Sequence, residues 1–79
     1  MLPTPEQVKE YIEAGLECSH IEVEGDGQHF FATIVSPVFE GMRSVARHQK
    51  VYAVLGERMK AEIHALSFKT FTPEEFKKA

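Results

Sequence analysis

The stretch HIEVEGDGQHFFATIVS, residues 20–36, predicts a β-hairpin around which the rest of the fold is organised. In its first half, Ile21 and Val23 alternate with glutamates, as in a strand with one buried and one wet face. The letters GDGQ then predict a turn, and HFFATIVS predicts the second strand. Three side chains of that strand should face the core: Phe30, Ala32 and Ile34. Phe31 then faces outward, either as a contact patch or as a tolerated aromatic residue.

Helical signals lie on both sides of this hairpin. Before it, Thr4 and Pro5 form a helix-start signature that is followed by apolar residues at helical spacing. After it we expect, in chain order, a short helical turn from Pro37, a helix over 44–61, a strand over 63–71 and a helix from Thr72. The apolar stripe predicted for the longer helix consists of Val45, Tyr52, Leu55 and Met59.

This order of elements, α-β-β-α-α-β-α, predicts an α+β fold in which helices pack on one face of a three-stranded mixed sheet. The first two strands form the antiparallel hairpin. A helical crossover separates the second strand from the third, and such a connection normally makes two strands of one sheet parallel.

The composition is that of a single globular domain spanning residues 1–79, with 43% hydrophobic and 27% charged residues. A chain of this length buries only about 60% of its unfolded surface, which leaves no room for a deep substrate cleft. No nucleophile has a spaced base and orienting acid, and no nucleotide-binding motif occurs, so we do not expect an enzyme.

The remaining compositional features favour a cytoplasmic protein that contacts no membrane. No apolar run approaches the roughly 18 residues of a membrane span, and the N-terminal residues lack the features of a signal peptide. Cys18 is the single cysteine, which excludes an internal disulfide and any cysteine-only metal site built from one chain.

Charge is distributed unevenly along the chain. Residues 1–40 carry eight acidic side chains and one lysine, whereas residues 41–79 carry eight basic and four acidic side chains. This asymmetry favours a polar partner surface over bulk nucleic-acid binding. Four basic residues recur at helical spacing on the predicted long helix: Arg43, Arg47, Lys50 and Arg58. They form either a solvated helix face or a surface for nucleic acid or an acidic partner.

Two histidines stand at the starts of the two strands that are predicted to be parallel. His29 is placed as the first residue of the second strand and His64 as the second residue of the third, so both should lie at one end of the sheet. Neighbouring strands are about 5 Å apart, close enough for both imidazoles to reach one metal centre. Each histidine taken alone is more typical of a structural residue. Two histidines cannot complete a four-ligand site, so a partner would have to supply the other ligands. A mononuclear zinc site completed by Glu or Asp is an alternative, although the spacing fixes no carboxylate as its third ligand.

The segments VSPVFEGMRSVARHQKVYAVL (35–55) and IHALSFKTFTPEEF (63–76) resemble the BolA family, most closely its short bacterial members of the IbaG type. The similarity runs from about residue 5 to residue 76 and implies a fold like that of the type II KH domain. It also implies a partner, a monothiol glutaredoxin, with which the chain would share a bridging [2Fe-2S] cluster. The implied role is iron-sulfur cluster trafficking or iron and stress regulation.

In the arrangement that this resemblance implies, a glutaredoxin cysteine and a glutathione thiol supply two cluster ligands, and this chain supplies His64 and His29. Histidine replaces cysteine on one iron in Rieske centres, and a ligating imidazole must be neutral, which couples cluster binding to pH. The isolated chain would carry no cofactor and would be a monomer or a weak homodimer.

The resemblance also supports an alternative, because some BolA proteins are DNA-binding transcription regulators. KH domains clamp the nucleic-acid backbone with a GXXG loop, where this chain has EGMRSV (40–45) with Gly41 alone. The residues that would bind DNA are Arg43, Arg47 and Lys50. His48 lies on the predicted apolar stripe, between Val45 and Tyr52, and we expect it to be a buried, hydrogen-bonded structural residue.

Overall fold

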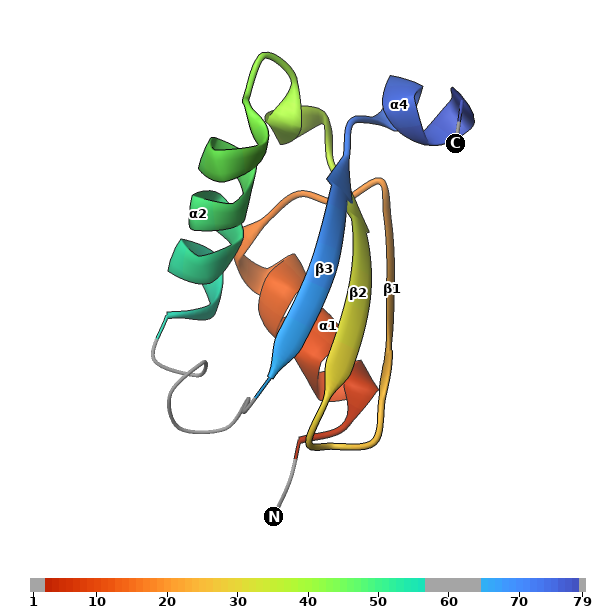
Figure 1. Ribbon diagram of the computed structural model, residues 1–79, viewed down its shortest axis with the longest axis vertical. Coiled ribbons are helices and arrows are strands. Elements are labelled where there is room, and N and C mark those ends of the chain that lie inside the picture. Colours follow the sequence, from red (N-terminus) through yellow and green to blue (C-terminus); the bar gives the residue numbers. More distant parts are fainter. Residues whose placement is uncertain (1–2, 57–64, 79) are drawn as a thin grey trace.

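The computed structural model describes residues 3–56 and 65–78, and the elements follow the predicted order (Figure 1). They are α1 (Pro5–Gly15), β1 (His20–Gly25), β2 (Phe30–Val35), the 3-10 helix η1 (Pro37–Phe39), α2 (Ser44–Leu55), β3 (Leu66–Phe71) and α4 (Pro73–Lys78). None of the helices in these two ranges is long and apolar enough to cross a membrane.

The sheet has the predicted topology, with β2 in the centre between β1 and β3. The hairpin strands are antiparallel, and Gly25 lies opposite Phe30 next to the turn. Strands β2 and β3 are parallel, and Phe30 lies opposite Leu66 at the end where both begin. The crossover argument is therefore confirmed: the starts of β2 and β3 share one end of the sheet.

Helix α1 begins with the expected capping box. The Thr4 hydroxyl accepts the Gln7 N–H at 3.2 Å, and the Thr4 N–H donates to the Gln7 side-chain oxygen at 2.9 Å. These bonds satisfy two of the backbone N–H groups that a helix start leaves without partners. The helix lies behind the sheet in Figure 1 and buries one stripe, Val8 and Ile12, against it.

The core lies between the sheet and helices α1 and α2. The three β2 side chains that alternation places inward, Phe30, Ala32 and Ile34, are all buried, and Phe31 is 40% exposed. The periodicity of two therefore predicted both faces of the central strand. Helices α1 and α2 approach closely at Gly15, where an added Cβ would lie 2.7 Å from a methyl group of Val54.

Two predictions for the long helix are wrong. Helix α2 ends at Leu55, because Gly56 adopts a φ of +57°, a conformation that stops helices; residues 57–61 lie outside the described ranges. The buried stripe consists of Val51 and Leu55, whereas Val45 and Tyr52 are 69% and 45% exposed. Met59, predicted for the same stripe, also lies outside the described ranges.

The packing of Arg47 accounts for the exposure of Val45. The Arg47 guanidinium lies 5.8 Å from the ring centre of the fully buried Phe39. Residues two apart on a helix are separated by about 200°, so Val45 must point to solvent when Arg47 points inward. An amphipathic pattern does not distinguish a helix with Val45 inward from one with Arg47 inward, because the aliphatic part of an arginine side chain can also pack against the core.

The short helix α4 packs differently from α1 and α2. Its Phe76 ring lies 5.7 Å from Phe71 and 5.0 Å from His20, centre to centre. By strand alternation both partners belong to the sheet face opposite the core, at the end where β3 finishes. Helix α4 therefore covers one end of that opposite face (Figure 1).

Candidate functional site: the His29 turn and the basic helix

His29 is the last residue of the β1–β2 turn, and not the first residue of β2 as predicted. Its side chain is exposed, while its backbone is held within the turn. One oxygen of the Asp26 carboxylate accepts the N–H groups of Gln28 and His29, both at 2.9 Å. The Asp26 N–H donates to the His29 carbonyl at 3.2 Å, which closes the turn from the other side. The backbone of His29 is thus held in place, and its exposed imidazole forms no hydrogen bond or ion pair with another residue of 3–56 and 65–78.

Asp26 is the residue that sequence reasoning missed at this turn. The hydrogen bond from the His29 backbone, and then that from Gln28, holds the pKa of the Asp26 carboxyl below its ordinary value. Aspartate followed by a polar turn residue is the signal that could have found it, because its side chain often accepts N–H groups two and three residues on.

Gly25 makes this geometry possible. Its φ is +155°, and a Cβ added there would clash with the carbonyl oxygen of His29. The backbone of the last β1 residue can therefore approach the His29 peptide only when that residue is glycine.

His64, the other predicted ligand, lies outside the described residues, as does the first part of the predicted strand 63–71. The described strand begins at Leu66. Ala65, which follows His64 in the chain, accepts the N–H of Phe30, which follows His29, at 2.9 Å. The residues next to the two histidines are therefore hydrogen-bonded to each other.

The other histidines and the cysteine in the described ranges have contacts of their own. His20 Nε2 lies 3.1 Å from a Glu22 oxygen, and the His48 ring lies 4.5 Å from the Phe68 ring. His48 is half-buried and not fully buried as expected. Cys18 Sγ donates to the Leu16 carbonyl, and burial, followed by the charge of Glu13, raises the pKa of its thiol. In the described part of the chain no three His, Cys, Asp or Glu side chains form a group that could hold a metal ion.

The predicted basic stripe is not uniform. Arg43 is exposed and Lys50 is half-buried, and neither forms a hydrogen bond or ion pair with another described residue. Arg47, between them, is only 12% exposed, and its Nε donates to the Met42 carbonyl at 2.9 Å. Arg58 lies outside the described ranges.

Arg47 forms a clamp with Glu75 that joins α2 to α4. Its two terminal nitrogens donate to the two Glu75 carboxylate oxygens at 2.7 and 3.2 Å. Glu75 also accepts the Thr72 N–H, and the Thr72 hydroxyl accepts the Glu75 N–H, so the same carboxylate caps α4. The hydrogen bond from Arg47, and then that from Thr72, lowers the pKa of Glu75 to about 2.

The chain is a short α+β domain with a three-stranded sheet and the element order given above. A histidine precedes its central strand, and its C-terminal helix is capped. Residues 4–75 match the family described as BolA-like protein, and the chain belongs to this family.

Similar proteins and solved structures agree with this family assignment. The chain is 45% identical over 58 residues to the "DNA-binding transcriptional regulator BolA" of Haemophilus influenzae; the match covers 73% of this chain and 56% of that relative's length. It is 35% identical over 71 residues to the "Acid stress protein IbaG" of Escherichia coli K12, covering 89% and 84% of the two chains. The structure of a BolA protein homologue from Coxiella burnetii matches with a TM-score of 0.84 and 46% identity, covering 96% of this chain and 99% of the other.

Proposed function

We propose that this chain is a non-enzymatic cytoplasmic adaptor that binds a monothiol glutaredoxin and contributes His64 and His29 to a bridging [2Fe-2S] cluster. A glutaredoxin cysteine and a glutathione thiol would complete the cluster. The observation that supports this proposal best is the bond from the Phe30 N–H to the Ala65 carbonyl, because it joins the residues that follow the two histidines.

The donor set suits a shared cluster better than a resident metal ion. Within residues 3–56 and 65–78, His29 is the only exposed histidine at the end of the sheet where β2 begins. No group of three His, Cys, Asp or Glu side chains that could hold a metal ion occurs in these ranges. Imidazole nitrogen is a known ligand of one iron in a [2Fe-2S] cluster. The role of this chain is then to hold the His29 backbone through Asp26 and to present a neutral ring.

Reconstitution of a cluster on a mixture of the chain and a monothiol glutaredoxin tests the proposal. We expect His64→Ala and His29→Ala each to change the visible absorption and circular dichroism of the cluster. His20→Ala is the matched control, because it removes a histidine at the other end of β1. Spectra that are the same for wild type and His64→Ala would refute the ligand assignment.

DNA binding is a second candidate, and it is favoured by the similarity to the DNA-binding transcriptional regulator BolA of Haemophilus influenzae. The structure narrows the residues that can test it. Arg43 and Lys50 lack a described partner, whereas neutralising Arg47 would break the clamp to Glu75 and confuse DNA binding with folding.

The DNA experiment therefore uses the double variant Arg43→Gln/Lys50→Gln. If both side chains contact phosphates, the salt dependence of duplex binding should become shallower by about one unit per lost contact. The matched control Lys9→Gln/Lys69→Gln makes the same change in net charge on other faces and should leave the slope unchanged. Equal slopes for the two double variants would remove this candidate.

A further inference from the structure

Within residues 3–56 and 65–78, the sheet face opposite the core is covered at one end only. Where β2 and β3 finish, Phe76 packs on Phe71, and Val35, which lies opposite Phe71, is only 1% exposed. Toward the start of β2, no helix of the described part of the chain covers this face (Figure 1), and Phe31 is 40% exposed. This half of the face is called the open half-face below; its residues are Glu22, Glu24, Phe31, Thr33, Ser67 and Lys69.

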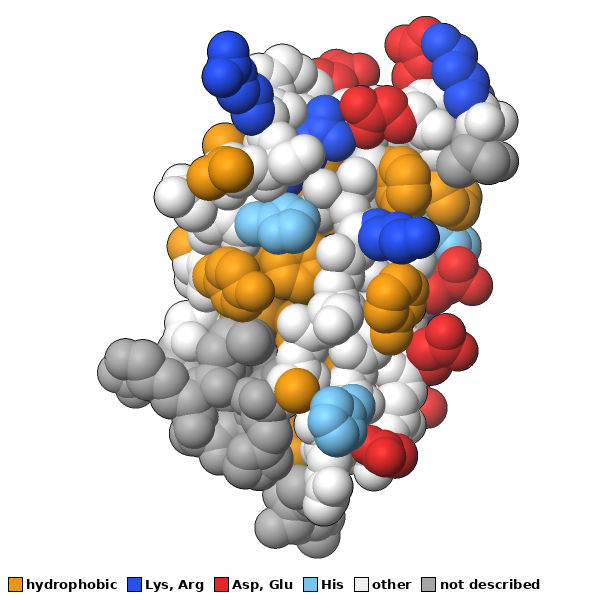
Figure 2. All heavy atoms as spheres, in the orientation of Figure 1, with side chains coloured by type: hydrophobic (Ala, Val, Ile, Leu, Met, Phe, Trp, Pro, Cys, Tyr) orange, Lys and Arg blue, Asp and Glu red, His pale blue; other side chains and the backbone are white. Residues whose placement is uncertain are grey.

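Strand register gives the open half-face an ordered arrangement of charge. Glu24 lies opposite Phe31, and Glu22 lies opposite Thr33, so the two carboxylates of β1 border the aromatic ring and hydroxyl of β2. Lys69 lies on the other side of Thr33, on β3. Figure 2 views this face, with acidic side chains along one border and a basic and a hydrophobic side chain beside them. One row across the strands is therefore Glu24, Phe31 and Ser67, and the next is Glu22, Thr33 and Lys69, so β1 contributes the negative charges and β3 the positive one.

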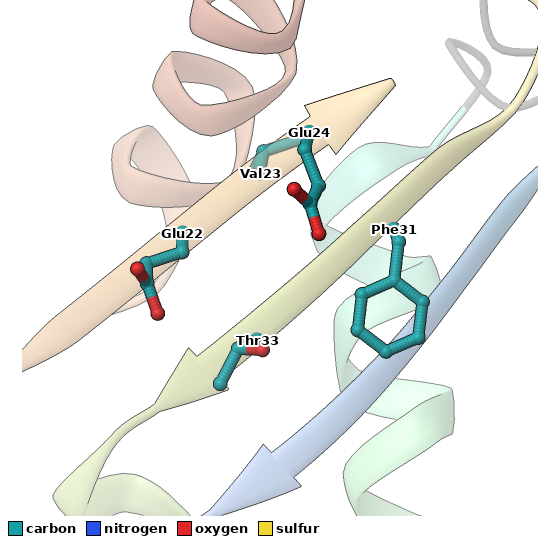
Figure 3. A pocket seen from close by; sticks show the side chains of 5 residues that line it. All are labelled: Glu22, Val23, Glu24, Phe31 and Thr33. Atoms are coloured by element: carbon teal, nitrogen blue, oxygen red, sulfur yellow. The ribbon is translucent and has the colours of Figure 1, made fainter.

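A hollow lies on the acidic side of this arrangement. It is lined by Glu22, Val23, Glu24, Phe31 and Thr33. Figure 3 shows the two glutamates, the phenylalanine ring and the threonine on the same side of the ribbon. A neighbouring hollow continues from Glu24 and Phe31 to His29.

The charged groups of the open half-face have few partners among the described residues. Glu24 and Lys69 form no hydrogen bond or ion pair with another described residue, and Glu22 has one, with His20 at 3.1 Å. The Arg47 clamp shows the contrast, because there each charged oxygen and nitrogen is bound by a neighbour.

We propose that the open half-face docks an extended segment of a partner protein that carries one arginine and, two residues further along, one carboxylate. The guanidinium lies over the Phe31 ring and donates to Glu24 and Glu22, since arginine both stacks on aromatic rings and binds carboxylates through paired N–H groups. The carboxylate reaches Lys69, which lies one strand spacing and two residues from Phe31, about 8 Å away. Lys69 disfavours a uniformly basic segment. This interaction does not depend on the iron-sulfur function.

A three-residue peptide tests the match. In acetyl-Arg-Ala-Asp-amide, an extended backbone places the two charged side chains on the same face, about 7 Å apart. Titrated into the ¹⁵N-labelled full chain, it should shift the backbone amide signals of residues 22–24, 31–33 and 69, with saturation. The uncharged peptide acetyl-Gln-Ala-Asn-amide should shift none of them.

Variants separate this docking from general attraction. Phe31→Thr keeps a residue suited to strands and should weaken peptide binding about two- to fivefold, through loss of the cation–aromatic contact. Glu24→Gln should weaken it as well, and Glu10→Gln, the same charge change on α1, should leave it unchanged. If Phe31→Thr and Glu24→Gln bind the peptide as tightly as wild type, or if the shifts spread evenly over α1, the proposal is wrong. Concentration-dependent shifts of the same amides without peptide would make a second copy of the chain the occupant, and would also overturn it.

Discussion

The His29 turn and the Arg47–Glu75 clamp are both polar clusters held by hydrogen bonds, yet they use their charged groups in opposite ways. In the clamp, the carboxylate binds the guanidinium, and the arginine is 12% exposed. In the turn, the Asp26 carboxylate binds only backbone N–H groups, and the His29 ring is left exposed. The first arrangement uses its side chains to join two helices. The second fixes a backbone so that a ring is available to something outside the chain.

Loss of the arginine should have the largest effect on stability. Arg47→Ala removes the two bonds to Glu75, the bond to the Met42 carbonyl and the packing on Phe39. We expect a loss of about 1–3 kcal/mol in the free energy of unfolding, measured by urea denaturation. The control Arg43→Ala lies on the same helix without those contacts and should stay within about 0.5 kcal/mol of wild type. Equal losses would show that Arg47 is not a structural residue.

Gly25→Ala should have the next largest effect, and it acts on the turn. The new Cβ meets the His29 carbonyl oxygen at a backbone conformation that disfavours side chains. We expect destabilisation of about 1–2 kcal/mol, together with displaced amide signals of residues 26–29. At Gly41 an added Cβ meets nothing within 4 Å, so Gly41→Ala carries only the strain of its φ of +78° and should cost less. A larger loss of stability in Gly41→Ala than in Gly25→Ala would contradict this description of the turn.

Acid should weaken the clamp in a defined pH window. The pKa of Glu75 is about 2 in the folded chain and 4.5 ordinarily, so ionised Glu75 stabilises the fold above pH 4.5. That contribution is lost as the pH falls from about 5 toward 2, because the unfolded state takes up its proton first. The difference in unfolding free energy between wild type and Glu75→Gln should therefore be constant near neutrality and shrink below pH 5. A difference that grows in acid would contradict the lowered pKa.

The smallest effect on stability is expected at Asp26, together with a specific effect on the turn. Asp26→Ala removes the acceptor for the N–H groups of Gln28 and His29, so those two amides should exchange with solvent severalfold faster. Asp26→Asn is the matched control, because its side-chain oxygen still accepts hydrogen bonds. Unchanged exchange at His29 in Asp26→Ala would mean that Asp26 does not position the histidine.

The parts of this molecule that follow local periodicity could be predicted from the sequence. Alternation in residues 20–36 predicted the hairpin and the two faces of β2, and the crossover predicted the parallel pairing. The Arg47–Glu75 clamp could not be predicted, since it joins residues 28 apart that have no local pattern in common. The exposure of Val45 follows from that clamp and was missed with it.

The candidate site was predicted in part. The residues after His29 and His64 are paired as the topology required, but His64 itself lies outside the described ranges. The role of Asp26 depends on turn geometry that a glycine-rich sequence leaves open. A contact between a histidine of this chain and a cluster shared with a partner stays a prediction.

Nitrogen hyperfine spectroscopy on the reduced cluster tests the central proposal most directly. The complex would be formed from a monothiol glutaredoxin and this chain, with ¹⁵N-histidine incorporated into this chain only. We predict strong couplings from ¹⁵N nuclei bound to iron, with one coupling lost in His29→Ala and another in His64→Ala. A cluster that shows no coupling to ¹⁵N in the wild-type complex would contradict the assignment of both histidines.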